Sequence, residues 1–145
     1  MGLFDPISTA VTGVNVSQTW LDTISDNIAN MNDVTSPSQG AYQTRFVVAA
    51  AIPGQAEGTG PGAQTEASVG GGTEVAGIAL GSPDGVLEYD PSNPLADKQG
   101  MVRSANVNLG DQMSNMMMAQ NGYEANLATI SQAEQAYQAA LGLHV

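Results

Sequence analysis

Few side chains in this sequence of 145 residues are able to carry acid–base chemistry. His144 is the only histidine, and it stands next to the C-terminus, where chains fray, so a role as a general base is disfavoured. Glu88 and Asp90 are two residues apart, which places both carboxylates on one face of a strand. A solvated pair is favoured over a glycosidase-type dyad, because a dyad needs a cleft that this chain is too thin to build. We therefore predict no catalytic residues and no enzyme activity.

Residue types that bind metals or cofactors are present without the spacing that such sites require. Asp90, Asn93 and Asp97 offer oxygen atoms to calcium but do not follow the spacing of a calcium-binding loop. Met116–Met118 is interpreted as adaptable core filling rather than as a methionine-rich metal site. Gly70–Gly72 is followed by no lysine and opens no predicted helix, which excludes a phosphate-binding loop. The sequence has no cysteine, and we predict neither a metal nor a cofactor.

The charge of the chain excludes other classes of partner. The sequence has 14 acidic residues and only three basic ones, Arg45, Lys98 and Arg103, which gives a net charge of -11. Three cations cannot form a basic patch for a phosphate backbone. We therefore expect no nucleic acid partner. We expect no direct membrane insertion either, because no stretch approaches the roughly 20 apolar residues of a membrane span.

The N-terminus carries no recognisable secretion signal. Met1–Asp5 lacks a positive segment followed by a continuous apolar segment, so a cleaved signal peptide is not expected. Targeting signals alone favour a cytoplasmic protein, and they leave open export by a route that uses no cleaved signal.

Two long helices are predicted, one at each end of the chain. Asp5 can cap the first helix, Pro6 suits its first turn, and the helix runs to about Met31. The second helix begins near Asn108, a capping residue, and runs to about Leu141. Each contains an internal glycine, Gly13 and Gly122. A glycine there is equally consistent with close approach of a neighbouring backbone and with tolerated drift.

Both helices carry hydrophobic residues at a spacing of seven, which is typical of a seam that packs against another helix. In the first helix the two rows are Ile7, Val14, Leu21, Ile28 and Ala10, Ser17, Ile24, Met31. In the second they are Leu109, Met116, Tyr123, Ile130, Tyr137 and Met113, Leu127, Leu141. The first helix is also rich in Asn, Asp, Thr, Ser and Gly, so we expect it to need a partner to remain ordered. That partner could be the other helix of the same chain or a helix of another subunit.

The middle of the chain is predicted to be irregular with short strands. We predict strands at 42–52, 74–79 and 85–89 that form one small β patch, with turns at 81–85 and 90–94. A flexible Gly-rich segment is expected at about 54–72.

These elements predict a division into an N-terminal helix (1–35), a middle region (36–105) and a C-terminal helix (106–145). The predicted fold class is mainly α with a small β patch, with the two helices packed as a coiled-coil-like bundle in a helical assembly.

Several motifs resemble those of the flagellar rod and hook axial proteins. Residues 25–32 read S-D-N-I-A-N-M-N, similar to the signature that closes the N-terminal helix in that family, and residues 123–126 read Y-E-A-N, similar to a motif of its C-terminal helix. The run Y-D-P-S-N-P-L-A-D at 89–97, followed by G-M-V at 100–102 and N-V-N at 106–108, resembles the proximal rod members in order and spacing.

The resemblance implies a structural subunit of the flagellar proximal rod. Such a subunit polymerises through its terminal helices into a hollow drive shaft that transmits torque and encloses the export channel. It would lie in the basal body within the periplasm, after export without a cleaved signal peptide. Its implied partners are copies of itself, rod subunits of the FlgB, FlgF and FlgG types, the rod adaptor FliE and the export apparatus. The alternatives are another type of rod subunit or a secreted helical adaptor protein.

The expected assembly interface combines the heptad residues with asparagines of the two motifs. Asn27, Asn30 and Asn126 are expected to hydrogen-bond across subunits, with helix-end caps and exposed polar residues as the alternative. The complete expected set is Ile7, Val14, Leu21, Ile24, Asn27, Ile28, Asn30, Met31, Met116, Tyr123, Asn126, Leu127, Ile130, Tyr137 and Leu141.

Overall fold

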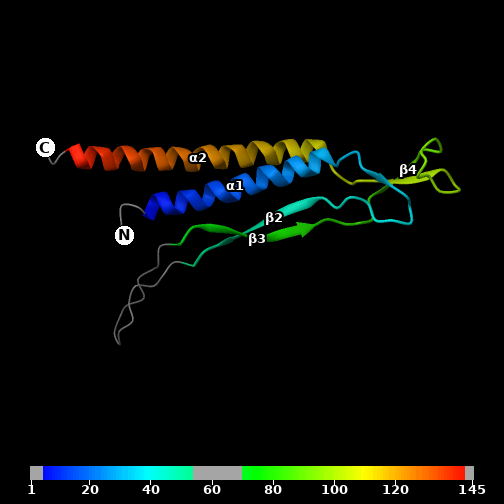
Figure 1. Ribbon diagram of the computed structural model, residues 1–145, viewed down its shortest axis with the longest axis horizontal. Helices are drawn as coiled ribbons and strands as arrows, with labels where there is room; N and C mark the ends of the chain where they lie inside the picture. The colour runs from blue at the N-terminus through cyan, green and yellow to red at the C-terminus, as the bar shows by residue number, and fades with distance from the viewer. Residues whose placement is uncertain (1–4, 54–69, 143–145) are drawn as a thin grey trace, which may run out of the picture. The chain divides into compact units, whose positions relative to one another are not determined.

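The computed structural model of the chain describes residues 5–53 and 70–142, which contain two helices and five strands (Figure 1). The elements are α1 (Asp5–Ala29), β1 (Val34–Thr35), β2 (Arg45–Ala51), β3 (Thr73–Leu80), β4 (Val86–Tyr89), β5 (Met101–Ser104) and α2 (Leu109–Gly142). The expected flexible segment lies mostly outside the described residues, as does His144. No helix in the described ranges has the length and apolar character needed to cross a membrane.

Both terminal helices are present close to their predicted bounds. The prediction that Asn108 caps α2 is confirmed, because its Oδ1 accepts hydrogen bonds from the backbone N–H groups of Gly110 (2.8 Å) and Asp111 (3.3 Å). At the C-terminal end of α1, Asn30 donates from its backbone N–H (3.1 Å) and from its Nδ2 (2.7 Å) to the carbonyl of Asp26. Polar side chains therefore define one end of each helix.

The strands form two separate sheets. In the three-stranded sheet, with order β1-β5-β4, the central strand β5 is antiparallel to both neighbours. Its Arg103 lies opposite Thr35 on one side and Leu87 on the other. The second sheet contains only β2 and β3. The prediction of a single β patch is wrong because β4 pairs with β5, a strand that was not predicted, and has no pairing with β3.

The chain divides into two compact units, each built from segments distant in sequence. Unit 1 comprises residues 1–19, 49–76 and 119–145, and unit 2 comprises residues 20–48 and 77–118. The fully buried residues of unit 2 include Ile24 and Val102, which are 2% and 1% exposed. Among the described residues of unit 1, the buried ones are small, namely Ala10, Ser17 and Ala119. Neither core is large, because few bulky apolar side chains reach the interior.

The predicted packing of the helices as a coiled-coil-like bundle is wrong. Helix accounts for 48% of the described residues and strand for about 20%, and the strands form two antiparallel sheets instead of one minor patch. On α2 the predicted row Met113, Leu127 and Leu141 is exposed, whereas Gln112 and Ala119 are buried. A coiled-coil seam requires large apolar side chains at its core positions. Here the inward positions hold small or polar residues, so the bulky ones are left on the outer surface.

Candidate assembly surfaces

In unit 2, the end of α1 is joined to the start of α2 by a buried asparagine. The amide Nδ2 of Asn27 donates to the carbonyl of Arg45 (2.9 Å) and to Oε1 of Gln112 (3.0 Å). Its Oδ1 accepts from the Arg45 N–H (2.9 Å) and from the Tyr42 hydroxyl (3.1 Å). The side chain is 1% exposed. These four bonds use the two donors and two lone pairs of the amide, so Asn27 acts within the chain.

The other residues of the N-terminal motif lie around this asparagine at the surface. Arg45 and Asp26 form an ion pair of 3.0 Å, and both side chains are about half exposed, so its contribution to stability is small. The Ser25 hydroxyl donates to the carbonyl of Leu21 within the same helix (2.9 Å). Asn30 is exposed. The motif therefore places Asn27 in the interior and leaves Asn30 and Asn32 on the surface.

In unit 1, the two helices approach each other at two glycines. A Cβ atom on Gly13 would lie 2.7 Å from the Asn126 amide, and one on Gly122 would lie 3.3 Å from the Ser17 hydroxyl. Asn126 donates its Nδ2 hydrogen to the carbonyl of Gly122 (2.8 Å). The close approach considered for Gly13 is therefore present, although the neighbour is a side chain and not a backbone. Small residues make this packing possible because they let the helices come close.

The residues expected at the assembly interface differ widely in exposure. Ile24 and Asn27 are buried. The half-buried members are Ile7, Val14, Leu21, Ile28, Met31, Met116, Tyr123, Asn126 and Ile130. The exposed members are Asn30, Leu127, Tyr137 and Leu141. The structure of one chain thus leaves most of this set at least partly accessible to a neighbour.

Many large apolar side chains are exposed, and the sequence reasoning identified only some of them. On α2, Leu109, Met113 and Met117 follow one another at four-residue spacing and are 37%, 55% and 58% exposed. Beyond the helices, the exposed set includes Phe46, Val48, Ile78, Leu80, Val86, Leu87, Tyr89 and Leu95. The sequence carried only a weak signal for the exposed residues outside the helices. Short strands show too little alternation to separate a buried face from an exposed one. Exposed apolar side chains on this scale are typical of surfaces that bind other proteins.

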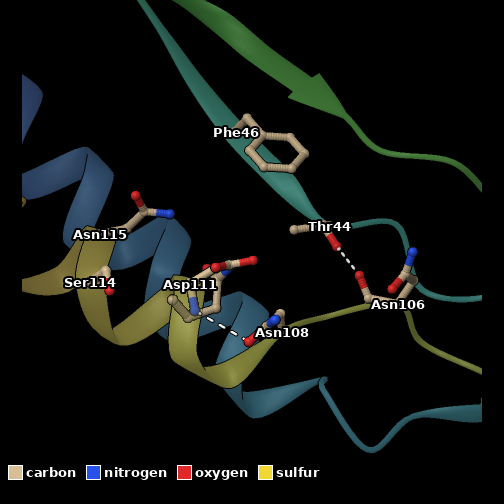
Figure 2. Close-up of a pocket in the computed structure, with 8 residues that line it drawn as sticks. Thr44, Phe46, Asn106, Asn108, Asp111, Ser114 and Asn115 are labelled. Carbon is tan, nitrogen blue, oxygen red and sulfur yellow. Dashed lines mark hydrogen bonds between the residues drawn. The ribbon is translucent and has the colours of Figure 1, made fainter.

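Unit 2 has a shallow hollow of about 450 Å³ between β2, the segment 106–108 and the start of α2 (Figure 2). Phe46 overhangs it and is 49% exposed, while the Thr44 hydroxyl donates to the carbonyl of Asn106 (3.0 Å). The remaining lining residues are polar: Asn108, Asp111, Gln112, Ser114 and Asn115. Pockets for small molecules are usually lined mainly by apolar side chains, and this one is not.

The oxygen-bearing side chains at 90–97 build turns. Asp90 Oδ1 accepts from the Ser92 N–H (3.2 Å) and hydroxyl (2.6 Å), and Asp97 Oδ1 accepts from the N–H groups of Gln99 and Met101. The hydrogen bond from the Ser92 hydroxyl is the main reason why the pKa of Asp90 lies below its ordinary value. Across residues 5–53 and 70–142 no three His, Cys, Asp or Glu side chains are grouped as metal ligands.

Comparison with known proteins identifies the class to which this arrangement belongs. Residues 7–36 match the family described as "Flagella basal body rod protein", and residues 98–143 match "Flagellar basal body rod FlgEFG protein C-terminal". These two segments include most of α1 and all of α2. The class is therefore that of the flagellar basal-body rod proteins.

Individual relatives narrow the class to one family. The chain is 33% identical to the flagellar basal-body rod protein FlgC of Borreliella burgdorferi, over 99% of this chain and 98% of the relative. It is 31% identical to FlgC of Escherichia coli O157:H7, over 90% and 87% of the two chains. It is 34% identical to FlgC of Salmonella typhimurium, over 77% and 75%. The chain belongs to the FlgC family of flagellar basal-body rod proteins.

Membership in this family confirms the prediction of a structural subunit of the flagellar rod. The chain is a component of the basal body and associates with other rod components. The motifs at 25–32, 89–97 and 123–126 carried this information in the sequence.

Proposed function

We propose that the chain forms part of the proximal rod by polymerising through its terminal segments, residues 1–35 and 106–145. In this proposal the rod is hollow, encloses the export channel and transmits torque from the motor. Residues 36–105 then lie outside the polymerising segments. Support comes from the FlgC relatives, of which that of Borreliella burgdorferi matches 99% of this chain, and from the apolar surface of its helices.

The observation that carries this proposal is the exposed apolar surface of α2. Met113, Leu127 and Leu141 are 55%, 42% and 54% exposed. Burying each of them against a neighbour would contribute on the order of 1 to 2 kcal/mol, because about half of a large apolar side chain remains to be removed from water. Several such contacts per subunit, repeated along a polymer, favour assembly over a solitary chain.

The proposed interface consists of the accessible members of the expected set. Leu127, Ile130, Tyr137 and Leu141 on α2 and Ile7, Val14 and Leu21 on α1 would contact neighbouring subunits. Asn27 and Ile24 would support this surface from inside unit 2, since both are buried there. Asn30 and Asn126 each form a hydrogen bond with their own helix and still have capacity for another subunit.

The proposed partners are further copies, rod subunits of the FlgB, FlgF and FlgG types, the adaptor FliE and the flagellar export apparatus. We also propose that the chain reaches the periplasm without a cleaved signal peptide and performs no catalysis. The proposal that the chain performs no catalysis is supported by the side-chain oxygens of Asp90, Asn93 and Asp97. These oxygens accept backbone hydrogen bonds in turns.

The test replaces one exposed apolar side chain in the bacterium that makes this protein. Leu127→Asp should leave the fold intact, because Leu127 is 42% exposed, and should leave the chain exported. It should abolish motility and yield incomplete rods, as seen by swimming assays and electron microscopy of basal bodies. Gln132→Asp adds the same charge at an exposed polar position of α2 and should remain motile.

Complete rods and normal swimming with Leu127→Asp would contradict assembly through this face of α2. Non-motile cells with Gln132→Asp would show that added charge, and not the loss of an apolar contact, disturbs the rod. A purified chain that gains helicity only with a stoichiometric non-flagellar partner would favour the secreted adaptor instead.

A further inference from the structure

Among the strands that the structure describes, none pairs with the outer side of β4, which is thus an open edge of the three-stranded sheet in unit 2. It is the last strand in the order β1-β5-β4, and all four of its residues are exposed. Val86, Leu87 and Tyr89 are 50%, 54% and 69% exposed. Edge strands in natural proteins are commonly protected by lysine, proline or a bulge. Val86–Tyr89 contains neither lysine nor proline, and its pairing with β5 is regular.

The hydrogen-bonding pattern shows which backbone groups face outward from this edge. The last residue pair of β4 and β5 is Tyr89 with Met101. In the next pair, the N–H of Asp90 donates to the carbonyl of Gly100 (2.9 Å). Because bonded and non-bonded pairs alternate in antiparallel strands, Glu88 and Val86 bond to β5, and Leu87 and Tyr89 direct their N–H and C=O groups away from it. The edge thus offers two donors and two acceptors to an added strand.

One face of this sheet carries a hollow of about 350 Å³ that is lined by apolar, polar and acidic side chains. Its apolar lining comes from Met31 and Val34, which are half-buried, while Val102 is 1% exposed and contributes little surface. Glu88 and Asp90 contribute the two carboxylates. No lysine or arginine lines the hollow. A long basic side chain suits such a surface, because its aliphatic stem can pack on the accessible part of Met31 and Val34 while its cation reaches the carboxylates.

The charges of this chain argue against a second copy as the occupant. Of its three cations, Arg45 lies in β2 and pairs with Asp26, and Arg103 lies in the central strand β5. The third, Lys98, lies in a turn. A copy therefore supplies no extended segment with an available cation, and its net charge of -11 would oppose the approach.

We propose that the β4 edge binds an extended segment of a different protein, in which apolar and basic residues alternate. The segment adds antiparallel to β4, bonds to the backbone of Leu87 and Tyr89, and directs a lysine or arginine toward Glu88 and Asp90. The β4 strand itself lies outside the segments proposed to polymerise, although the hollow also includes Val34 of residues 1–35. The test uses the isolated chain and short peptides, so its outcome does not depend on rod assembly.

The experiment is a titration of the ¹⁵N-labelled full chain with end-blocked peptides of seven residues. The probe alternates valine and arginine, and its matched control has glutamate in place of each arginine. At a concentration ten times its Kd, the arginine peptide should slow amide exchange at Leu87 and Tyr89 about tenfold. Exchange at Glu88, whose amide is already bonded to β5, should change much less. The glutamate peptide should have no effect.

Two variants separate the backbone and charge contributions. Leu87→Pro removes one outward donor and should abolish binding, with the amide spectrum of β5 showing whether the sheet persists. The double variant Glu88→Gln with Asp90→Asn keeps the backbone edge and should weaken binding about two- to fivefold per lost charge pair.

Several results would overturn the proposal. Equal binding of the glutamate peptide, or full affinity of the double variant, would remove the charge selectivity. Binding without protection of Leu87 and Tyr89, or full affinity of a folded Leu87→Pro variant, would remove strand addition. Protection of both amides by raising the chain concentration alone would make a second copy the occupant.

Discussion

Asn27 in unit 2 and Asn126 in unit 1 have the same side chain in two different settings. Asn27 is 1% exposed and forms four hydrogen bonds that connect α1 with β2, Tyr42 and α2. Asn126 is half-buried, donates to the carbonyl of Gly122 in its own helix and fills the space beside Gly13. The first asparagine connects elements by polar bonds, and the second acts mainly by its volume.

The difference shows two ways to hold helices together without a large apolar core. In unit 2, a saturated amide fixes one arrangement, because any shift would leave buried donors and acceptors unpaired. In unit 1, glycine, serine and alanine permit a close approach with few specific bonds. We therefore expect the helix pairing in unit 2 to be the more sensitive to a single substitution.

The largest effect is expected for Asn27→Leu. Leucine has a similar size but leaves Gln112 Oε1, the Arg45 N–H and the Tyr42 hydroxyl without their present partner. The free energy of unfolding should fall by about 3 kcal/mol, measured by urea denaturation followed by circular dichroism. Asn30→Leu is the matched control, and it should change the value by less than about 0.5 kcal/mol because Asn30 is exposed. Equal effects of the two variants would refute the central role of Asn27.

An intermediate effect is expected for Gly13→Val. Its Cβ would meet the Asn126 amide at 2.7 Å, so we expect a loss of about 2 kcal/mol from overpacking. The same substitution in an Asn126→Ala background should cost about 1 kcal/mol less, because the obstructing amide is gone. Gly122→Ala is the control, since its Cβ would meet only the rotatable Ser17 hydroxyl at 3.3 Å. A Gly13→Val penalty that persists unchanged in the alanine background would mean that Asn126 is not the obstacle.

The smallest effect is expected for Asn126→Ala alone. Within the described residues, the Asn126 side chain forms a hydrogen bond only with its own helix, and alanine favours the helix by about 0.5 kcal/mol. The unfolding free energy should therefore change by less than about 1 kcal/mol, in contrast to Asn27→Leu, when both are measured in the same urea titration. A loss similar to that of Asn27→Leu would remove the distinction between the two units.

The terminal helices and their ends were readable from the sequence because the signals are local. Asn108 accepts hydrogen bonds from the first turn of α2, and α1 begins at Asp5, as predicted. The predicted end of α2 at Leu141 falls one residue before the observed one. The strand β2 was also predicted, within three residues at its start. Strands β1 and β5 were missed: β1 has only two residues, too few to show alternation, and β5 follows a turn-rich stretch that gave no strand signal. They exist only because each finds a partner elsewhere in the chain.

The sequence was informative about class and weak about packing. Motifs at 25–32 and 89–97 indicated the rod proteins, and the family comparisons agree. The seven-residue spacing on α1 marked Ala10, Ser17 and Ile24, which are buried, but it suggested a coiled coil that is absent. Periodicity reports which residues share a helix face, and it does not report what covers that face.

By itself, the sequence determined the two helices, the cap of α2 at Asn108, the acidic charge and the motifs of the rod family, because each depends on neighbouring residues or on composition. Only the tertiary structure decided that Asn27 is an internal hydrogen-bonding centre, that Gly13 accommodates Asn126, and that β4 is left as an open edge. Each of these depends on residues many positions apart being brought together, and local propensity carries no information on such pairings.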